Sequence, residues 1–195
     1  MTKTKNKKAL DKEWVNDPSR WGVAKYGVDL FINLSQPPLL LDGASLDVED
    51  DEQGNFVGIG IYGLPVMGGN FACYYWSDWE IAKTLIIPRF IAHNGISDLR
   101  KLQKWGLKID ESWLIYDTQL MAHIIDSSRR QYGLKKLVKE DLGIVYPSYE
   151  DLCGKKGGKN HTNLSKLPLE LVAEYNACDT YTTYQLYEYQ KIRLY

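Results

Sequence analysis

Strand patterns fill the first half of this 195-residue chain, and helical patterns join them only later, an order that narrows the possible folds sharply. Leu46 and Val48 alternate with acidic residues, which is the period-2 pattern of a strand with one buried face. Further on, Ile96, Leu99 and Leu102 are three positions apart, which indicates a helix. We therefore expect an α/β fold in which helices cover the faces of a sheet. The expected strands are 44–49, 56–62, 71–76, 89–93 and 113–116, and the expected helices are 78–85, 95–105, one opening at 117–118, 133–142 and 169–189.

Particular residues mark where two of these helices begin and end. Asp117 is a good N-cap for the helix that follows it, because its carboxylate can accept hydrogen bonds from the first free amides. Gly143 is the residue type that ends a helix such as 133–142. In the helix after Asp117, we expect the apolar side chains of Leu120, Met121 and Ile124 to face the core.

Length and composition favour one globular unit preceded by a short lead-in. Hydrophobic residues make up 44% of the chain and charged residues 25%, which is ordinary for a folded domain. Turn signals at 17–19 and 36–38, after a lysine-rich start, predict a lead-in over residues 1–40 and a domain over residues 41–195. The net charge of −1 excludes a basic footprint over the whole chain, so any binding of nucleic acid must depend on local clusters.

The absence of targeting signals and the use of cysteine favour a cytoplasmic location. No apolar run approaches the roughly 18 residues of a membrane helix, and the N-terminus lacks the apolar region of a secretory signal. Cys73, Cys153 and Cys178 match neither a zinc spacing nor a disulfide framework, which favours a reducing environment. We expect an intracellular monomer with no membrane partner.

Three acidic motifs occur in an order that would let them meet in one site. Asp47 and Glu49 are two apart on an expected strand and therefore share a face. Asp98 lies at the start of an expected helix, and Tyr175 and Asp179 are neighbours on the last helix because they are four apart. Four carboxylates from three elements could enclose two hard cations such as Mg²⁺ or Mn²⁺. Each motif alone is more typical of solvated surface acids than of a metal site, so the prediction depends on the set of three.

Together these motifs resemble those of the DnaQ-like (DEDD) exonuclease superfamily, in the branch that carries a tyrosine in its third motif. The proofreading domains of family A DNA polymerases and ribonuclease D belong to this branch. The segments 116–118, 132–137 and 141–143 also resemble the polymerase type, and the resemblance extends from residue 41 to residue 189. It implies a ribonuclease H-like fold with a mixed five-stranded sheet flanked by helices. It also implies hydrolysis of a nucleic acid from its 3′ end, with release of nucleoside 5′-monophosphates.

The resemblance assigns a role to each motif residue. Asp47 would bridge two Mg²⁺ or Mn²⁺ ions, Glu49 and Asp179 would complete the first ion site, and Asp98 would hold the second ion. Tyr175 would orient the attacking water or help to deprotonate it. Two metals are what phosphodiester hydrolysis needs, since one lowers the pKa of water and the other stabilises the leaving oxygen.

Some positions depart from the family pattern or allow a second interpretation. Asn94 matches the asparagine of the second motif, but it could equally be the N-cap of the helix 95–105. Ser97 stands where an aromatic residue is frequent, and Asp50 stands where a threonine or serine is common. The turn 50–55 is shorter than in bacterial polymerases, so we expect it to separate a terminal base pair only weakly.

Basic residues cluster in two stretches where an exonuclease would need them. Contacts from these residues to phosphates would position a strand without reading its sequence. The alternative for each residue is a solvated helix face or loop. The candidates for contact with nucleic acid are Asn94, Arg129, Arg130, Lys135, Lys136, Lys139, Lys155, Lys156 and Lys159.

The expected substrate is the 3′ end of single-stranded DNA. The preference for DNA depends on the polymerase-like stretch 117–143, and RNA stays open as a partner through the alternative of a ribonuclease D-like exoribonuclease. A non-catalytic module that binds nucleic acid is a further alternative, although the presence of all four acids argues against it. Because no polymerase sequence follows the last helix, we expect a free-standing enzyme, of the kind that a virus or phage genome could encode.

Overall fold

The computed structural model describes residues 12–40, 43–84, 89–110 and 112–194, and it has a mixed sheet flanked by helices. The strand order is β1-β4-β3-β2-β5-β6. Strands β4, β3 and β2 are antiparallel neighbours, whereas β1 joins β4, β5 joins β2 and β6 joins β5 in parallel. The strands are β1 (Leu30–Ile32), β2 (Ala44–Asp50), β3 (Phe56–Gly63), β4 (Ala72–Trp76), β5 (Arg89–Ala92) and β6 (Leu114–Asp117).

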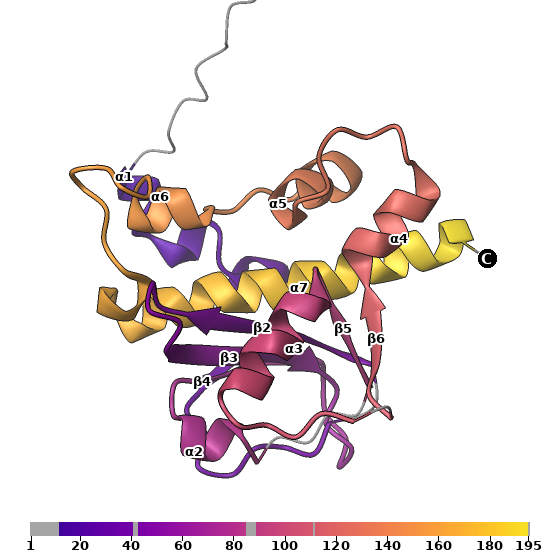
Figure 1. The fold of residues 1–195 in the computed structure, drawn as a ribbon, viewed down its shortest axis with the longest axis horizontal. Coiled ribbons are helices and arrows are strands. Elements are labelled where there is room, and N and C mark those ends of the chain that lie inside the picture. Colours follow the sequence, from indigo (N-terminus) through magenta and orange to yellow (C-terminus); the bar gives the residue numbers. More distant parts are fainter. Residues whose placement is uncertain (1–11, 41–42, 85–88, 111, 195) are drawn as a thin grey trace, which may run out of the picture.

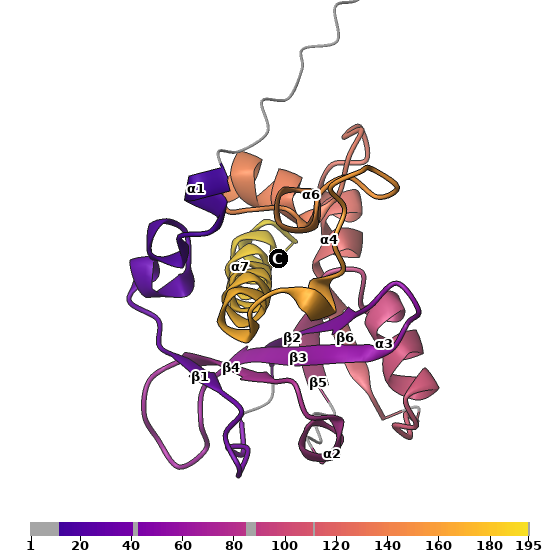
Figure 2. The same ribbon diagram turned by 90° about the vertical axis from the view of Figure 1, so that its left-hand side faces the viewer.

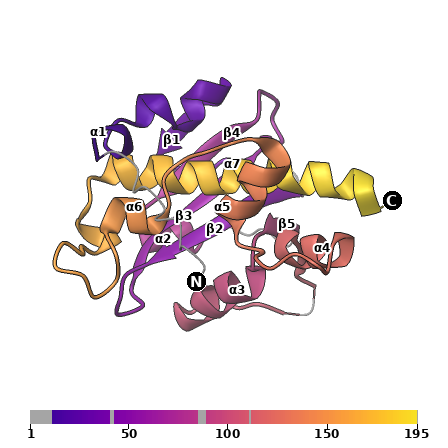
Figure 3. The ribbon, with the colours of Figure 1, turned by 90° about the horizontal axis from the view of Figure 1, so that it is seen from above.

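Helices cover both faces of the sheet, and the longest one, α7, spans the length of the molecule (Figure 1). Seen along its axis, α7 lies on one face of the sheet and α2 lies beneath the other face (Figure 2). Seen from above, α3 and α4 lie along one side of α7, and the N-terminal helical segments lie along its other side (Figure 3). The α-helices are α1 (Lys12–Val15), α2 (Trp79–Ala82), α3 (Gly95–Lys104), α4 (Thr118–Ile125), α5 (Leu134–Leu137), α6 (Tyr149–Cys153) and α7 (Leu169–Leu194). The short turns are η1 (Pro18–Arg20), η2 (Val23–Tyr26), the π-helical η3 (Val138–Leu142) and η4 (Leu164–Lys166).

The alternation along β2 separates an apolar core from a polar layer. Leu46 and Val48 are buried in the core beneath α2 and α3. Ser45 points to the opposite face, where its hydroxyl donates to the carbonyl oxygen of Thr180 in α7 at 2.7 Å. Because successive side chains of a strand point to opposite faces, Asp47 and Glu49 share the α7 face with Ser45.

Within the described residues the sheet has six strands, not the five that the family resemblance implied. The additional strand is β1, which pairs with β4 and comes from the segment expected to be a lead-in. The same segment contributes Trp21, whose side chain is fully buried and whose carbonyl oxygen lies 3.4 Å from the Cys178 sulfur of α7. Residues 12–34 therefore pack on the same core, while the boundary at residue 40 stays a prediction. Residues 1–11 of the lead-in and residue 85 of the helix expected over 78–85 lie outside the described residues.

The predicted helix ends are confirmed, but the apolar face of α4 is not. The carboxylate of Asp117 accepts hydrogen bonds from the first amides of α4, and Gly143 ends the helical stretch with φ 70°. The expectation that Leu120 and Ile124 face the core is wrong, since 60% and 73% of their surfaces are exposed. Helix α4 buries its small residues Thr118 and Ala122 instead, because close contact with α7 leaves no room for larger side chains there. Similarly, Ile96 at the start of α3 is exposed.

No helix within residues 12–40, 43–84, 89–110 and 112–194 combines the length and the apolar character that a membrane crossing requires.

Candidate active site

Three of the predicted carboxylates meet between β2 and α7. One oxygen from each of Asp47, Glu49 and Asp179 lies within 4.8 Å of the other two, so a single cation could contact all three. Asp98 reaches the same region from α3 and is 5% exposed. Its Oδ2 atom has no hydrogen-bond partner among the described residues. The four acids predicted from separate motifs are therefore neighbours, with Asp98 beside the group of three.

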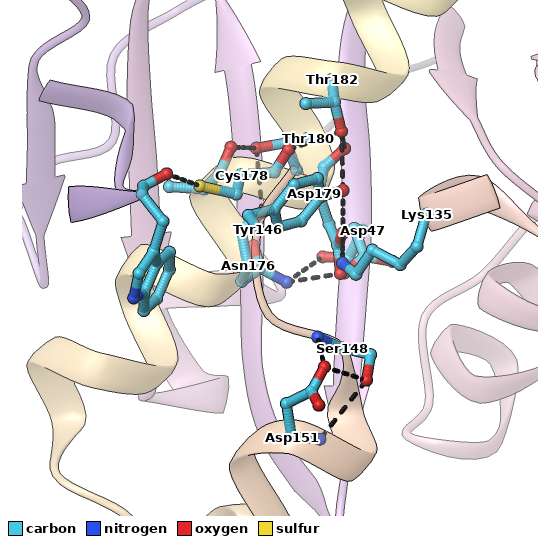
Figure 4. A network of polar contacts seen from close by, with 12 residues as sticks. Asp47, Lys135, Tyr146, Ser148, Asp151, Asn176, Cys178, Asp179, Thr180 and Thr182 are labelled. Atoms are coloured by element: carbon cyan, nitrogen blue, oxygen red, sulfur yellow. Dashed lines mark hydrogen bonds and ion pairs between the residues drawn. The ribbon is translucent and has the colours of Figure 1, made fainter. Parts of the chain in front are cut away.

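A close approach of α7 to the sheet brings Asp179 to the strand acids. The amide of Asn176 donates to Asp47 Oδ2 at 2.8 Å (Figure 4). The same amide nitrogen lies 3.4 Å from Glu49 Oε1. On β3, a Cβ atom at Gly60 would lie only 1.6 Å from Asn176 Oδ1, so a glycine is required for this approach. The amide of Asn176 thus fixes the separation of the two strand acids from the helix.

The carboxylates repel one another, and burial adds to this effect. Burial and the nearby Glu49, Asp98 and Asp179 raise the pKa of Asp47. Burial and Asp179 raise the pKa of Glu49 to about 7. Burial also raises the pKa of Asp98, an effect that the Lys101 ammonium partly opposes. Bound protons or cations would stabilise these carboxylates, because either would reduce the repulsion between their negative charges.

Lys135 supplies a positive charge to this cluster. Its ammonium pairs with the carboxylate of Asp179 and lies 3.8 Å from the ring centroid of Tyr146 (Figure 4). It also lies 4.4 Å from the ring centroid of Tyr175. Lys135 is one of the predicted contacts to nucleic acid, and the structure places it beside the acids of the site. Its ammonium therefore lies where it can face both the carboxylates and a bound phosphate.

Tyr146 is a site residue that the sequence analysis missed. Its hydroxyl donates to Asp179 Oδ1 at 2.6 Å and lies 2.8 Å from Thr182 Oγ1 (Figure 4). The residue follows the helix end at Gly143 and precedes the capping box at Ser148, so both ends of its segment are fixed. No spacing relates Tyr146 to an acidic motif, and only the packing of this segment on α7 brings it to Asp179.

Tyr175 lies in the cluster with the acid four positions later on α7. Its side chain is buried, and burial, followed by the charges of Asp179, Glu49 and Asp47, raises the pKa of its hydroxyl. The phenol is therefore protonated at neutral pH in the absence of a cation and can donate a hydrogen bond. Tyr74 and Asp78 are also four residues apart, but they form no such site. Tyr74 packs in the core beneath α2, and Asp78 caps that helix.

The backbone of the second motif, at Asn94 and Gly95, is held by the Asp117 carboxylate and not by the side chain of Asn94. Asn94 occupies the N-cap position of α3 with φ 64°, but its side chain makes no capping hydrogen bond. The Asp117 carboxylate accepts from the backbone amides of Asn94 and Gly95 at 3.2 and 2.9 Å. One acid at the end of β6 therefore orders the starts of both α3 and α4, and the Asn94 side chain stays exposed.

The predicted basic residues divide into paired and exposed groups. Arg129 forms ion pairs with Asp126, Glu140 and Asp141, the last at 2.6 Å, so its charge holds the chain after α4 in place. Lys136 pairs with Glu140. The exposed members are Arg130, Lys139, Lys155, Lys156 and Lys159, the last three on the loop after α6.

Comparison with known proteins independently supports the exonuclease family that the acidic motifs resemble. The model of the 3′-5′ exonuclease family matches residues 73–193. DNA polymerase DpoZ of Acinetobacter phage SH-Ab 15497 is 26% identical over 176 residues, which cover 83% of this chain and 27% of that polymerase. DNA polymerase I of Chloroflexus aurantiacus is 35% identical over 103 residues, which cover 52% of this chain and 10% of the polymerase. The chain thus spans about a quarter or less of the length of these relatives.

Solved structures share the fold at low sequence identity. Brucella melitensis NrnC with bound Mg²⁺ is 16% identical with a TM-score of 0.58, and the match covers 86% of this chain and 81% of that one. Escherichia coli RNase D, an exoribonuclease, is 19% identical with a TM-score of 0.50, over 78% of this chain and 40% of that one. The predicted ribonuclease H-like fold is confirmed by these matches.

Proposed function

Because this chain belongs to the 3′-5′ exonuclease family, we propose that it is a metal-dependent enzyme that shortens DNA from the 3′ end. We propose further that single-stranded DNA is the preferred substrate and that nucleoside 5′-monophosphates are the products. The observation that carries the proposal is the group of Asp47, Glu49 and Asp179, whose oxygens lie within 4.8 Å of one another between β2 and α7.

The donor atoms of this group fit a hard divalent cation. All of them are carboxylate oxygens, which Mg²⁺ and Mn²⁺ prefer. The buried Oδ2 of Asp98, which lacks a partner among the described residues, is a further ligand atom. Asp47 would contact both of two ions, with Glu49 and Asp179 on the first and Asp98 on the second. Bound there, the ions would supply an activated water and charge stabilisation at the leaving oxygen. The Mg²⁺ in the NrnC structure supports this proposal.

Residues of the chain itself would position the reacting groups. The Tyr175 hydroxyl faces Asp179 and would donate a hydrogen bond that orients the attacking water. Lys135 would turn its ammonium from Asp179 towards the scissile phosphate once the carboxylates are neutralised. Tyr146 would hold Asp179 in one orientation through its 2.6 Å hydrogen bond.

The preference for single strands has a physical basis. Reaching acids that lie, partly or fully buried, between a strand and a helix requires an unpaired terminal nucleotide, and opening terminal pairs costs a few kcal/mol. The turn between β2 and β3 is short, which supports weak separation of paired ends. Duplex ends should therefore be cut more slowly than single strands.

The choice of DNA over RNA depends on the polymerase relatives. DpoZ aligns with 83% of this chain and comes from a phage, which supports a phage-encoded enzyme that acts on DNA inside the cell. The second candidate is an exoribonuclease, supported by RNase D and by the NrnC structure bound to pGG.

The test is a time course with oligonucleotides labelled at the 5′ end. Single-stranded DNA, duplex DNA and RNA of one sequence are incubated with Mg²⁺ and separated by length. We expect ladders that shorten progressively from the 3′ end, with single-stranded DNA consumed fastest. A labelled mononucleotide released from the start would mean the opposite polarity, and faster loss of RNA would favour the exoribonuclease.

A further inference from the structure

Helix α3 borders a groove that carries positive charge and lies next to the acid site. The groove has a volume of about 370 Å³. Arg100 and Lys104 are one turn apart on α3 and therefore share a face. None of these cations was among the basic residues predicted to contact nucleic acid. The residues that line the groove are Asn94, Ile96, Ser97, Arg100, Lys101 and Lys104.

Two of the three cations are held in place by the sheet. Lys101 lies 2.8 Å from Asp50 Oδ1 and donates to the Val48 carbonyl oxygen at 3.1 Å. Lys104 donates to the Gly54 carbonyl oxygen at 2.9 Å, and this neutral partner leaves the ammonium charge uncompensated. Arg100 is exposed and forms no ion pair or side-chain hydrogen bond with any part of the chain that the structure describes. The groove thus offers two uncompensated positive charges, the ammonium of Lys104, which Gly54 holds in place, and the unpaired guanidinium of Arg100.

The groove continues the acid site along the helix. Asp98 lies on the same helix, and Lys101 is close enough to Asp98 and Asp47 to oppose the effect of burial on their pKa values. From Asn94 to Lys104, α3 extends about 15 Å, and its end contacts the turn between β2 and β3 through Gly54. A strand whose terminal phosphodiester lies at the acids could therefore continue along α3 over the next nucleotides.

We propose that the α3 groove binds the phosphodiester backbone of the substrate strand on the 5′ side of the terminal nucleotide. Arg100 and Lys104 each contact one phosphate. Asn94 and Ser97 supply hydrogen bonds to the sugar-phosphate chain, and the exposed side chain of Ile96 supplies an apolar surface for a sugar or base. Contacts of this kind position a strand without reading its sequence. The inference rests on the proposed function, since it assigns the path by which a strand reaches the acids.

Equilibrium binding of labelled strands tests the groove without any need for hydrolysis. Fluorescein-labelled dT12 and rU12 are titrated with the full chain in EDTA, by anisotropy, at several salt concentrations. The variants are Arg100→Gln, Lys104→Gln, their combination, and Arg100→Lys, which keeps the charge. Arg89→Gln is the matched control, because Arg89 is exposed at the opposite end of β5. Circular dichroism checks that each variant is folded.

We expect each single neutralisation to weaken binding on the order of fivefold. Each lost phosphate contact should reduce the magnitude of the slope of log K against log salt by about 0.7. The slope of the double variant should therefore be smaller by about 1.4. Arg100→Lys should retain most of the slope, and Arg89→Gln should match the wild type. Both strands should respond alike, because DNA and RNA share the phosphate.

Several outcomes would overturn the inference. These are an unchanged salt slope in the double variant, an equal loss in Arg89→Gln, or an effect confined to one of the two strands. A wild-type protein that shortens no oligonucleotide would refute the proposed function, whereas the loss of binding in the groove variants would still establish the groove.

Discussion

The hydroxyl of Tyr175 is the one neutral group of the acid site that we assign to the reacting water. We expect Tyr175→Phe to lower kcat on the order of 10²-fold, because general acid–base assistance contributes about that much. The ring and its contact with Lys135 are retained, so the fold and substrate binding should change little. Single-turnover rates on a 5′-labelled DNA strand measure the effect. Tyr74→Phe is the control, and a larger loss there would show that the third motif was assigned to the wrong tyrosine.

The hydroxyl of Tyr146 acts on the site only through Asp179. Tyr146→Phe keeps the ring beneath the Lys135 ammonium and removes the 2.6 Å hydrogen bond to the carboxylate. We expect the Mg²⁺ concentration needed for half-maximal rate to rise about tenfold or more, with the rate recovered at saturating Mg²⁺. The measurement is a Mg²⁺ titration of DNA hydrolysis. Tyr184→Phe is the control, because Tyr184 lies on α7 and packs against Tyr62 and Phe71, and it should leave the titration unchanged. An unchanged titration in Tyr146→Phe would leave Tyr146 with only a packing role.

At the scale of elements, contact between β3 and α7 determines the geometry of the site. We expect Gly60→Ala to destabilise the protein by about 2 kcal/mol, because the new methyl group would overlap the Asn176 amide and force α7 outward. Urea unfolding measures the change, and the separation of Asp179 from the strand acids should reduce activity as well. Gly133→Ala is the control, since nothing lies within 4 Å of its added Cβ. Equal stability of the two variants would contradict this role for Gly60.

The elements also show how far the sequence could predict the structure. Strand β2 and helix α7 were predictable, because the alternation around Asp47 and the spacing of Tyr175 and Asp179 are local patterns. Strand β1 was missed, since its three residues pair with β4 far along the chain and have no periodicity of their own. The exposed Leu120 could not be predicted either, because the tight packing of α4 on α7 overrides apolar spacing.

The residues of the candidate site also fall into those that the sequence could predict and those that it could not. The shared face of Asp47 and Glu49 follows from their spacing on one strand, whereas the meeting of these acids with Asp98 and Asp179 was expected from the order of the motifs and from the family resemblance. Tyr146 reaches Asp179 only through contact between distant segments, which no local pattern records. The α3 groove is lined by residues of α3 and its N-cap, and its basic residues were not singled out from the sequence.

At the scale of the whole molecule, the repulsion among the clustered acids and their partial burial should make stability depend on pH. Burial raises the pKa of Asp47, and that of Glu49 to about 7, whereas unfolded carboxyls titrate near pH 4. The folded state therefore holds protons that the unfolded state releases. The contribution of these groups to stability is full below about pH 4 and is lost as the pH rises through about 7.

We therefore expect the Tm in EDTA to fall between pH 5.5 and pH 8. Mg²⁺ at about 100 times its Kd should raise the Tm at pH 8 by roughly 5–10 °C, because the ion binds the folded site. Asp47→Asn should show a smaller fall with pH in EDTA and a smaller gain from Mg²⁺. Differential scanning calorimetry measures the Tm of the wild type and of Asp47→Asn at each pH, with Mg²⁺ and with EDTA. A Tm that is insensitive to Mg²⁺ would count against a cation site.

The most direct test of the central claim is DNA hydrolysis by Asp47→Ala, since Asp47 is the acid assigned to both ions. The rate of 3′ shortening of a 5′-labelled single strand is measured with Mg²⁺ and with EDTA, alongside Glu170→Ala, which removes an exposed acid from α7. We predict that the wild type and Glu170→Ala are active only with Mg²⁺, and that folded Asp47→Ala loses at least about 10³-fold. Near-native turnover by folded Asp47→Ala, or full wild-type activity in EDTA, would contradict the account.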